Sequence, residues 1–285
     1  MKQMEIRTLA GIDNIKILTV FNESFSDYFV PFKLTEEQLV SKMIADKVDL
    51  ELSVGVFENQ KLIAFMLHGF DIINNQKVVY NGGTGVIPEK RGLGLTKQMY
   101  LFNLPVLEKK GIDKINLEVI SNNIPAIASY KKSGFKTTRE LVCFKGELQT
   151  KKFNNELELK KLLTYPWEQM ESFWDITTTW QNSKNVLINL IGENDSLGAY
   201  IKDQLVGYVI CSPKSKLIQQ IAVHKDFRKI GIASTLVAQV AEKHESTLSI
   251  INVDKKAQHV TRFFKSVGFD NYLEQIEMEL ILNKN

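Results

Sequence analysis

Two short segments of the chain combine arginine and glycine in a way that suits anion binding. The first contains Arg91-x-x-Gly94-x-Thr96 and the second Arg228-x-x-Gly231-x-Ala233, each between an apolar run and a helical pattern. The first backbone N–H groups of a helix lack intrahelical partners, and the helix dipole favours negative charge there. Glycine allows close approach, and arginine adds a permanent positive charge. The spacing therefore predicts a phosphate-type anion at each segment.

Two nucleotide motifs are excluded by the residues that follow. Position 97 is lysine where GxGxxG needs its third glycine, and the GK[ST] ending of a nucleotide P-loop is missing. Two glycines alone also suit a tight turn without any ligand. The return of the same loop in the second half favours a binding role.

The loop belongs to a longer internal repeat, which divides the chain into two similar halves. Matched residues recur at offsets of 143, then 137, then 134, as expected if two copies have diverged by small deletions. The matches are Gly55, Phe57 and Leu62 with Gly198, Tyr200 and Leu205; Val86, Arg91 and Gly94 with Val223, Arg228 and Gly231; and Lys131, Gly134 and Phe135 with Lys265, Gly268 and Phe269. The repeat predicts two domains, residues 1–150 and 151–285.

Each half reads as mixed α/β. In the first half, extended runs alternate with helical spacing, and a strand, helix and strand in succession imply one parallel crossover. Strands are expected at 54–57, 62–67, 77–86 and 114–120, with helices at 92–110 and 125–132. In the second half, strands are expected at 217–223 and 248–253, with helices at 231–244 and through 261–266; 165–182 has no clear assignment.

A second motif follows the first loop. The run from Asn123 to Phe135 fits NxxAxxxYxxxGF, with Tyr130 at the tyrosine position, and the two arginine loops fit the pattern (Q/R)xxGx(G/A), except that Thr96 takes the last place in the first. In these segments the chain resembles the GNAT-type N-acetyltransferase superfamily, twice in tandem. The resemblance implies an α/β fold with two GNAT-like domains. Each would be a mixed, mostly antiparallel twisted sheet with a splayed parallel pair of strands, flanked by helices.

The resemblance also implies the chemistry. Pantetheine of acetyl-CoA, the co-substrate, would lie between the splayed strands, and a bulge near Gly82, Gly83 and Gly85 would turn a backbone N–H toward the thioester oxygen. Tyr130 would be the general acid for the leaving thiolate. The residues expected to hold CoA are Val86, Ile87, Arg91, Gly92, Leu93, Gly94, Leu95, Thr96 and Asn123, with Val223, Arg228, Gly231 and Ala233 in the second half.

The general base and the acceptor site are less defined by these motifs. Glu118 is the candidate base, with His68 as the alternative, since either could relay a proton from an ammonium; a structural role is open for both. The aromatic run 28–32 lies where the family builds part of its acceptor pocket, and it could equally pack the core.

The second half departs from the family at two positions. Phe264 stands where Tyr130 stands, and Ala257 replaces Asn123. A phenylalanine cannot donate a proton, so the first half is expected to be catalytic. The second half is expected to be a degenerate copy that binds CoA or only completes the acceptor site.

Composition sets the remaining expectations. With 36 Lys and Arg against 33 Asp and Glu, the net charge of +3 gives no basis for a nucleic-acid or membrane partner. No apolar run reaches the ~18 residues of a membrane span, and no Cys or His spacing suits a metal. We expect a cytoplasmic monomer or homodimer that acetylates a primary amine of a small molecule or peptide. Two alternatives stay open: a silent acyl-CoA-binding scaffold, and an acyltransferase with another acyl donor.

Overall fold

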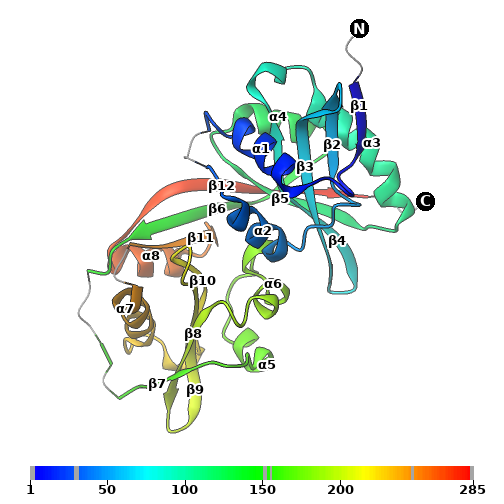
Figure 1. Cartoon of the computed structure of the whole chain (residues 1–285). Coiled ribbons are helices and arrows are strands. Elements are labelled where there is room, and N and C mark those ends of the chain that lie inside the picture. The colour runs from blue at the N-terminus through cyan, green and yellow to red at the C-terminus, as the bar shows by residue number, and fades with distance from the viewer. Residues whose placement is uncertain (1–3, 29–31, 150–152, 155, 245–246, 283–285) are drawn as a thin grey trace. The chain divides into compact units, whose positions relative to one another are not determined.

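The computed structural model describes residues 4–28, 32–149, 153–154, 156–244 and 247–282. The chain forms two compact units, which Figure 1 draws with the colours running from blue to red along the sequence. The N-terminal unit comprises Met1–Thr138 with Ile276–Asn285, and the C-terminal unit comprises Arg139–Gln275.

The N-terminal unit is built on one mixed sheet. Its strands from the first half of the chain run in the order β1-β2-β3-β4-β5, where β1 to β4 pair antiparallel and β4 and β5 pair parallel. Their bounds are β1 Met4–Thr8, β2 Val54–Glu58, β3 Lys61–Ile73, β4 Gln76–Val86 and β5 Lys114–Ile120. The expected strands, crossover and sheet type are confirmed.

The parallel pair separates after three residues. Val78 to Tyr80 pair with Lys114 to Asn116, and beyond them β4 and β5 diverge. On its other side β4 has a bulge, because Asn81 and Gly83 oppose successive residues of β3 and leave Gly82 as the extra residue. The splay and the bulge that the family resemblance implied are therefore both present.

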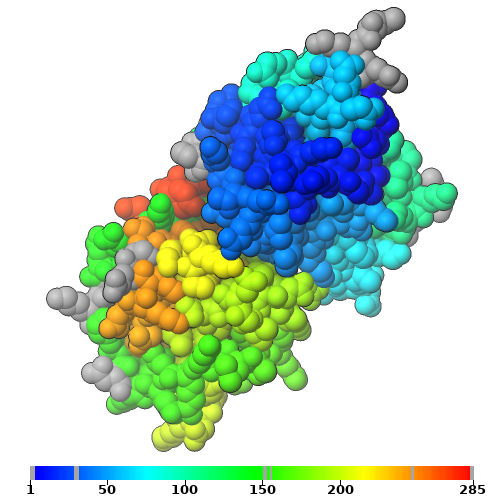
Figure 2. All heavy atoms as spheres, in the orientation of Figure 1, coloured from blue at the N-terminus to red at the C-terminus, as the bar shows by residue number. Residues whose placement is uncertain are grey.

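Helices cover both faces of this sheet. The ring of Phe21 on α1 (Asn14–Ser24) stacks on Phe65 of β3 with centroids 5.5 Å apart. Tyr100 on α3 (Leu95–Lys109) lies near His68, also on β3. Because side chains alternate along a strand, His68 points to the face of the sheet opposite to Phe65. The blue atoms, which belong to the early described residues of the chain, cover much of the unit on the side seen in Figure 2.

Capping side chains fix where these helices begin. Asp13 caps α1, and Thr35 forms a capping box with Gln38 at the start of α2 (Glu36–Ala45). Asn123 accepts from the N–H of Ala126 and so caps α4 (Ile124–Lys132). One turn of 3-10 helix, η1 (Pro88–Lys90), lies between β4 and α3.

The C-terminal unit repeats this plan. Its strands run in the order β6-β11-β10-β9-β8-β7, and the parallel pair β10 and β11 is registered at Leu217 and Ser249 alone. β10 carries a bulge whose extra residue, Gln219, lies 137 positions after Gly82, so the two bulges are equivalent. The strands are β6 Lys136–Gly146, β7 Glu158–Lys161, β8 Asp195–Ile201, β9 Gln204–Ser212, β10 Leu217–Val223 and β11 Leu248–Asp254.

The helices of this unit also follow the repeat. α7 (Ile232–His244) and α8 (Gln258–Ser266) correspond to α3 and α4, as the sequence predicted. η3 (Lys225–Phe227) corresponds to η1. The stretch that the sequence left unassigned holds α5 (Trp167–Glu171) and η2 (Trp180–Asn182), followed by α6 (Lys184–Asn189).

The last strands of the two copies are exchanged. β12 (Phe269–Ile281) ends the chain, yet its residues from Ile276 onward belong to the N-terminal unit, where Met278 is buried in the core and Glu279 pairs with Lys114 of β5 at 2.7 Å. Conversely, most of β6 belongs to the C-terminal unit and pairs with β11. The units therefore divide at 138/139 and 275/276, whereas the repeat placed one boundary at 150/151. Sequence similarity cannot tell which of two like strands completes which sheet.

Candidate functional site

The anion loop of the N-terminal unit lies between β4 and α3. Val86 ends the strand, and the N–H of Ile87 is bonded to Ile63 of β3. Gly92 and Gly94 have φ of +78° and +71°, and a Cβ at either would meet open space. Gly94 caps α3, so the first N–H groups of that helix begin beside an open, left-handed turn. Leu95 is buried beneath the turn, while Leu93 and half-buried Thr96 flank it.

The loop arginines are used inside the protein. Arg91 donates to both carboxylate oxygens of Asp27 at 2.7 Å and to the carbonyl of Ser24, which lowers the pKa of Asp27 below its ordinary value. Arg228 likewise pairs with Asp175 at 2.7 Å. Each guanidinium thus fastens the segment after the first helix of its unit to the loop. The backbone N–H groups at the start of the following helix are donors that this pairing leaves for an anion.

Tyr130 lies in a buried chain of hydroxyl and amide groups. Its side chain is hydrogen-bonded to Thr84, and burial raises its pKa to about 12. Asn81 donates to Thr84 and to the phenol oxygen of Tyr100, both at 2.8 Å. Tyr130 therefore stays protonated at neutral pH and is held beside the splayed end of β4, as a general acid requires.

Glu118 lies on the opposite face of the same strands. It accepts a 2.6 Å hydrogen bond from the phenol of Tyr80, which is next to Asn81 and so points the other way. Asp46, at the end of α2, also lies there, because a Cβ on Gly82 would meet its carboxylate at 2.8 Å. The splay thus has a phenol on the α3 face and carboxylates on the α2 face.

His68 is a core residue. It is 0 % exposed, its Nδ1 lies 3.1 Å from the carbonyl of Leu52, and burial lowers its pKa to about 4. The ring is therefore neutral and enclosed, which does not suit the relay considered from the sequence.

The aromatic segment after α1 is only partly described. Phe29 to Pro31 lie outside the described residues, whereas Tyr28 and Phe32 both pack on Phe25 with centroids 5.0 and 5.5 Å apart. Tyr28 is also hydrogen-bonded to Asn123, the cap of α4. This bond links the segment after α1 to the start of the last helix.

The C-terminal unit lacks the buried chain of polar groups. When the two units are aligned on their bulges and helix starts, each of these polar residues falls opposite an apolar one. The C-terminal unit therefore has no hydroxyl at these positions that could protonate a thiolate. The matches are Asn81 with Ile218, Thr84 with Ile221, Tyr100 with Val237, Asn123 with Ala257 and Tyr130 with Phe264. Along β11, Asn252 takes the place of Glu118.

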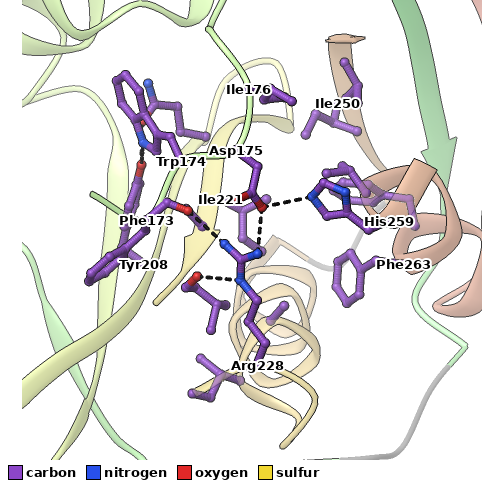
Figure 3. A pocket seen from close by; sticks show the side chains of 18 of the residues that line it. Phe173, Trp174, Asp175, Ile176, Tyr208, Ile221, Arg228, Ile250, His259 and Phe263 are labelled. Atoms are coloured by element: carbon purple, nitrogen blue, oxygen red, sulfur yellow. Dashed lines mark hydrogen bonds and ion pairs between the residues drawn. The ribbon is translucent and has the colours of Figure 1, made fainter. Parts of the chain in front are cut away.

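This unit nevertheless contains a large cavity of about 790 Å³. All four residues expected to hold CoA in the second half line it: Val223, Arg228, Gly231 and Ala233. Figure 3 shows aromatic and aliphatic walls that include Phe173, Tyr208, Ile250 and Phe263. The anion loop and the splayed strands therefore form one concave space, of a size typical of ligand pockets.

Two sets of bonds tie the walls of this cavity together. The carboxylate of Asp175 joins Arg228 to His259 on α8, at 2.7 and 3.0 Å (Figure 3). The second set starts on β10, where Gln220 donates to the carbonyl of Asn182, whose side-chain amide donates to the carbonyl of Ile251 on β11. The space between β10 and β11 is thus bridged on the face where the N-terminal unit has a carboxylate.

Two further features concern the described part of the chain as a whole. None of its helices is long and apolar enough to cross a membrane. Within the same residues, no three His, Cys, Asp or Glu side chains are grouped in a way that could hold a metal ion.

The residues predicted from the sequence do not include Asn81, Thr84 and Tyr100, although the repeat contains a signal for them. When the offset of 137 is continued along β4 and α3, these three polar residues align with three apolar residues of the second half. Asp27 and Asp175 gave no comparable signal, because they lie in segments where the repeat has no matching motif.

Comparisons with known proteins agree with this geometry. The model of the acetyltransferase (GNAT) family matches residues 17–135, and that of the acetyltransferase (GNAT) domain matches residues 162–282. A curated mycothiol acetyltransferase of Saccharomonospora viridis is 43% identical over 53 residues, which is 19% of this chain and 17% of that protein. The matched stretch thus spans under a fifth of either protein.

Solved structures show the same fold over the whole chain. A GCN5-related N-acetyltransferase from Sphaerobacter thermophilus superposes with a TM-score of 0.74 at 14% identity, covering 98% of this chain and 96% of that one. A tandem GNAT protein from the clavulanic acid biosynthesis pathway gives 0.73 at 11% identity, covering 99% and 100%. With two matched domains and two splayed, bulged sheets, the chain belongs to the GNAT acetyltransferase family as a tandem member.

Proposed function

We propose that the protein is an N-acetyltransferase that moves the acetyl group of acetyl-CoA to a primary amine in a ternary complex, and that the N-terminal unit performs the reaction. The observation that carries this proposal is the buried chain of Tyr130, Thr84, Asn81 and Tyr100. All of these positions are apolar in the second copy, although the bulge, the splay and the loop persist. The repeat thus contrasts a unit that keeps a proton donor with one that has lost it.

One face of the splayed strands suits the binding of acetyl-CoA, and the other suits the binding of the amine. The open turn at Gly92 and Gly94 begins α3, so backbone N–H groups on that face can hold the pyrophosphate. The thioester would then lie beside the bulge at Gly82, where a backbone N–H can stabilise the oxyanion. The loop arginine positions this turn through Asp27.

Proton transfer would run between the two faces. A cationic acceptor first gives one proton to Glu118, which passes it to solvent and leaves a neutral amine. As the C–N bond forms, the nitrogen gives Glu118 a second proton, and Tyr130 donates one to the sulfur as the C–S bond breaks. The products are the N-acetyl compound and free CoA thiol. Asp46, on the same face as Glu118, is already paired with Lys42, so the carboxylate of Glu118 is the group that favours an acceptor arriving as a cation. This fits a primary amine of a small molecule or peptide.

A second role is favoured for the C-terminal unit. Its cavity includes the complete anion loop, but Phe264 leaves no hydroxyl at the position of Tyr130, and Asn252 puts an amide at the position of Glu118. We infer that this unit binds an acyl-CoA without turning it over.

Paired loop variants test the assignment of activity. Gly94→Trp would fill the open turn of the first loop, and Gly231→Trp would fill the second. Acetyl-CoA binding by calorimetry and thiol release with a panel of primary amines are measured for both. We expect Gly94→Trp to abolish turnover and Gly231→Trp to remove one binding site while turnover continues. Loss of turnover in Gly231→Trp alone would overturn the proposal.

A further inference from the structure

In both units an amide side chain holds the carbonyl that precedes the loop glycine. In the N-terminal unit, Gln98 of α3 donates from Nε2 to the carbonyl of Leu93 at 3.1 Å. In the C-terminal unit the donor is Nδ2 of Asn154, which bonds the carbonyl of Ile230 at 3.0 Å. Asn154 comes from the described residues 153–154, next to the boundary between the repeats and 76 residues away; this pair is called the inter-repeat segment below.

Holding this carbonyl fixes the direction of the next N–H. A trans peptide is planar, so its C=O and N–H point in opposite directions, and the described residues contain no cis peptide. The bond from Asn154 therefore turns the N–H of Gly231 away from the inter-repeat segment. Gly231 lines the cavity, where this N–H is one of the donors available to an anion.

The position equivalent to Gln98 explains why a distant residue is needed. That position is Thr235, whose short side chain bonds the carbonyl of Gly231 at 3.0 Å. Its hydroxyl also accepts from the backbone N–H of Asn154 at 2.9 Å, which seats Asn154 3.7 Å from where a Cβ of Gly231 would be. Asn154 is held in turn by accepting from the N–H of Glu156.

We propose that Asn154 is a positioning residue for the anion loop of the C-terminal unit, and that the affinity of this unit for the pyrophosphate of CoA depends on the inter-repeat segment. The proposal rests on the acyl-CoA role proposed above for that unit. In the N-terminal unit the same function is performed within α3 by Gln98, so its loop is independent of that segment.

The test is a CoA titration by calorimetry in the Gly94→Trp background, where only the second site remains. Asn154→Asp keeps the acceptor for the N–H of Glu156 but loses the donor and adds a negative charge beside the loop. We expect Asn154→Ala to weaken CoA binding about threefold to tenfold and Asn154→Asp to weaken it more. The thermal midpoint of the free protein is expected to stay unchanged.

Rescue separates positioning from a general effect on folding. Thr235→Gln in the Asn154→Ala protein places an amide where the first unit has Gln98, and we expect it to restore most of the affinity. Gln98→Ala in the Gly231→Trp background is the matched control and is expected to weaken the first site by a similar factor.

The outcomes distinguish this inference from the proposed function. Wild-type affinity in both Asn154 variants, a weakening matched by a lower midpoint, or failure of the rescue would overturn the role of Asn154. Absence of any CoA site in the Gly94→Trp protein, with the first site intact in Gly231→Trp, would also overturn it and leave acetyl transfer by the N-terminal unit standing. If the wild-type chain bound no CoA at all, both the role of Asn154 and the proposed acetyl transfer would be overturned.

Discussion

The phenol of Tyr80 donates a hydrogen bond of 2.6 Å to Oε2 of Glu118 across the parallel strands of the N-terminal unit. Tyr80 is 3 % exposed, and burial with the nearby carboxylates raises its pKa well above the ordinary value. The phenol is therefore a fixed donor, and it holds the carboxylate at the point where β4 and β5 part.

Removing this carboxylate is expected to slow acetyl transfer. Glu118→Gln keeps the shape and the bond from Tyr80 but cannot accept a proton, so kcat is expected to fall about 100-fold or more. Tyr80→Phe is the matched variant, because it removes the hydrogen bond from the phenol but keeps the carboxylate, and its decrease in kcat is expected to be smaller. Steady-state rates of thiol release give both values; equal rates for Glu118→Gln and wild type would exclude Glu118 as the base.

Tyr130→Phe is expected to separate turnover from binding. The loss of the phenol removes the proton donor while the buried ring remains, so kcat is expected to fall about 100-fold with the affinity for acetyl-CoA unchanged. The reverse change, Phe264→Tyr, restores one hydroxyl among apolar neighbours and is expected to add no activity. Single-turnover rates and calorimetry check both. An unchanged kcat in Tyr130→Phe would remove the acid role.

The same phenol predicts a loss of stability at high pH. Burial raises the pKa of Tyr130 from 10.0 to about 12, so between these values the unfolded chain loses its proton before the folded protein does. This contribution is complete below pH 10 and is lost as pH rises to 12, by about 3 kcal/mol. Urea unfolding across this range should show a flatter decline for Tyr130→Phe; identical slopes would contradict the buried, neutral phenol.

Burial of His68 predicts a loss of stability at low pH. Burial lowers its pKa from 6.5 to about 4, so the unfolded chain binds the proton first as the pH falls. The contribution is complete above pH 6.5 and is lost on going down to pH 4, by about 3 kcal/mol. His68→Leu should remove this part of the acid sensitivity, measured by urea unfolding from pH 7 to 4. A wild-type profile in the variant would show that the ring is not the titrating group.

The exchanged strand predicts that one element supports two cores. Met278 and Phe269 both lie on β12, are each 0 % exposed, and pack in the N-terminal and C-terminal cores respectively. Met278→Ala and Phe269→Ala are each expected to cost about 2–5 kcal/mol. Hydrogen exchange followed by mass spectrometry should show loss of protection in the N-terminal unit for the first and in the C-terminal unit for the second. The reverse pattern would rule out the exchange.

The local elements and the family could be read from the sequence, because hydrophobic spacing, helix stops and two motifs depend on residues close together in the chain. Gly82, Gly92 and Gly94 lie at the bulge and turns that their type predicted. The repeat also pointed to Phe264 as the loss in the second copy. Apart from the repeat, which compares two local stretches with each other, each of these signals lies within at most a few tens of residues.

Only the tertiary structure decided which distant groups meet. Three such relationships depend on how the elements pack in each unit. Arg91 pairs with Asp27, Tyr130 and Glu118 lie on opposite faces of the sheet, and Asn154 bonds to Ile230. The strand exchange belongs here too, since β6 and β12 are similar enough in pattern to complete either sheet. The choice between them is made by the total burial and pairing in each folded unit, which no local pattern encodes.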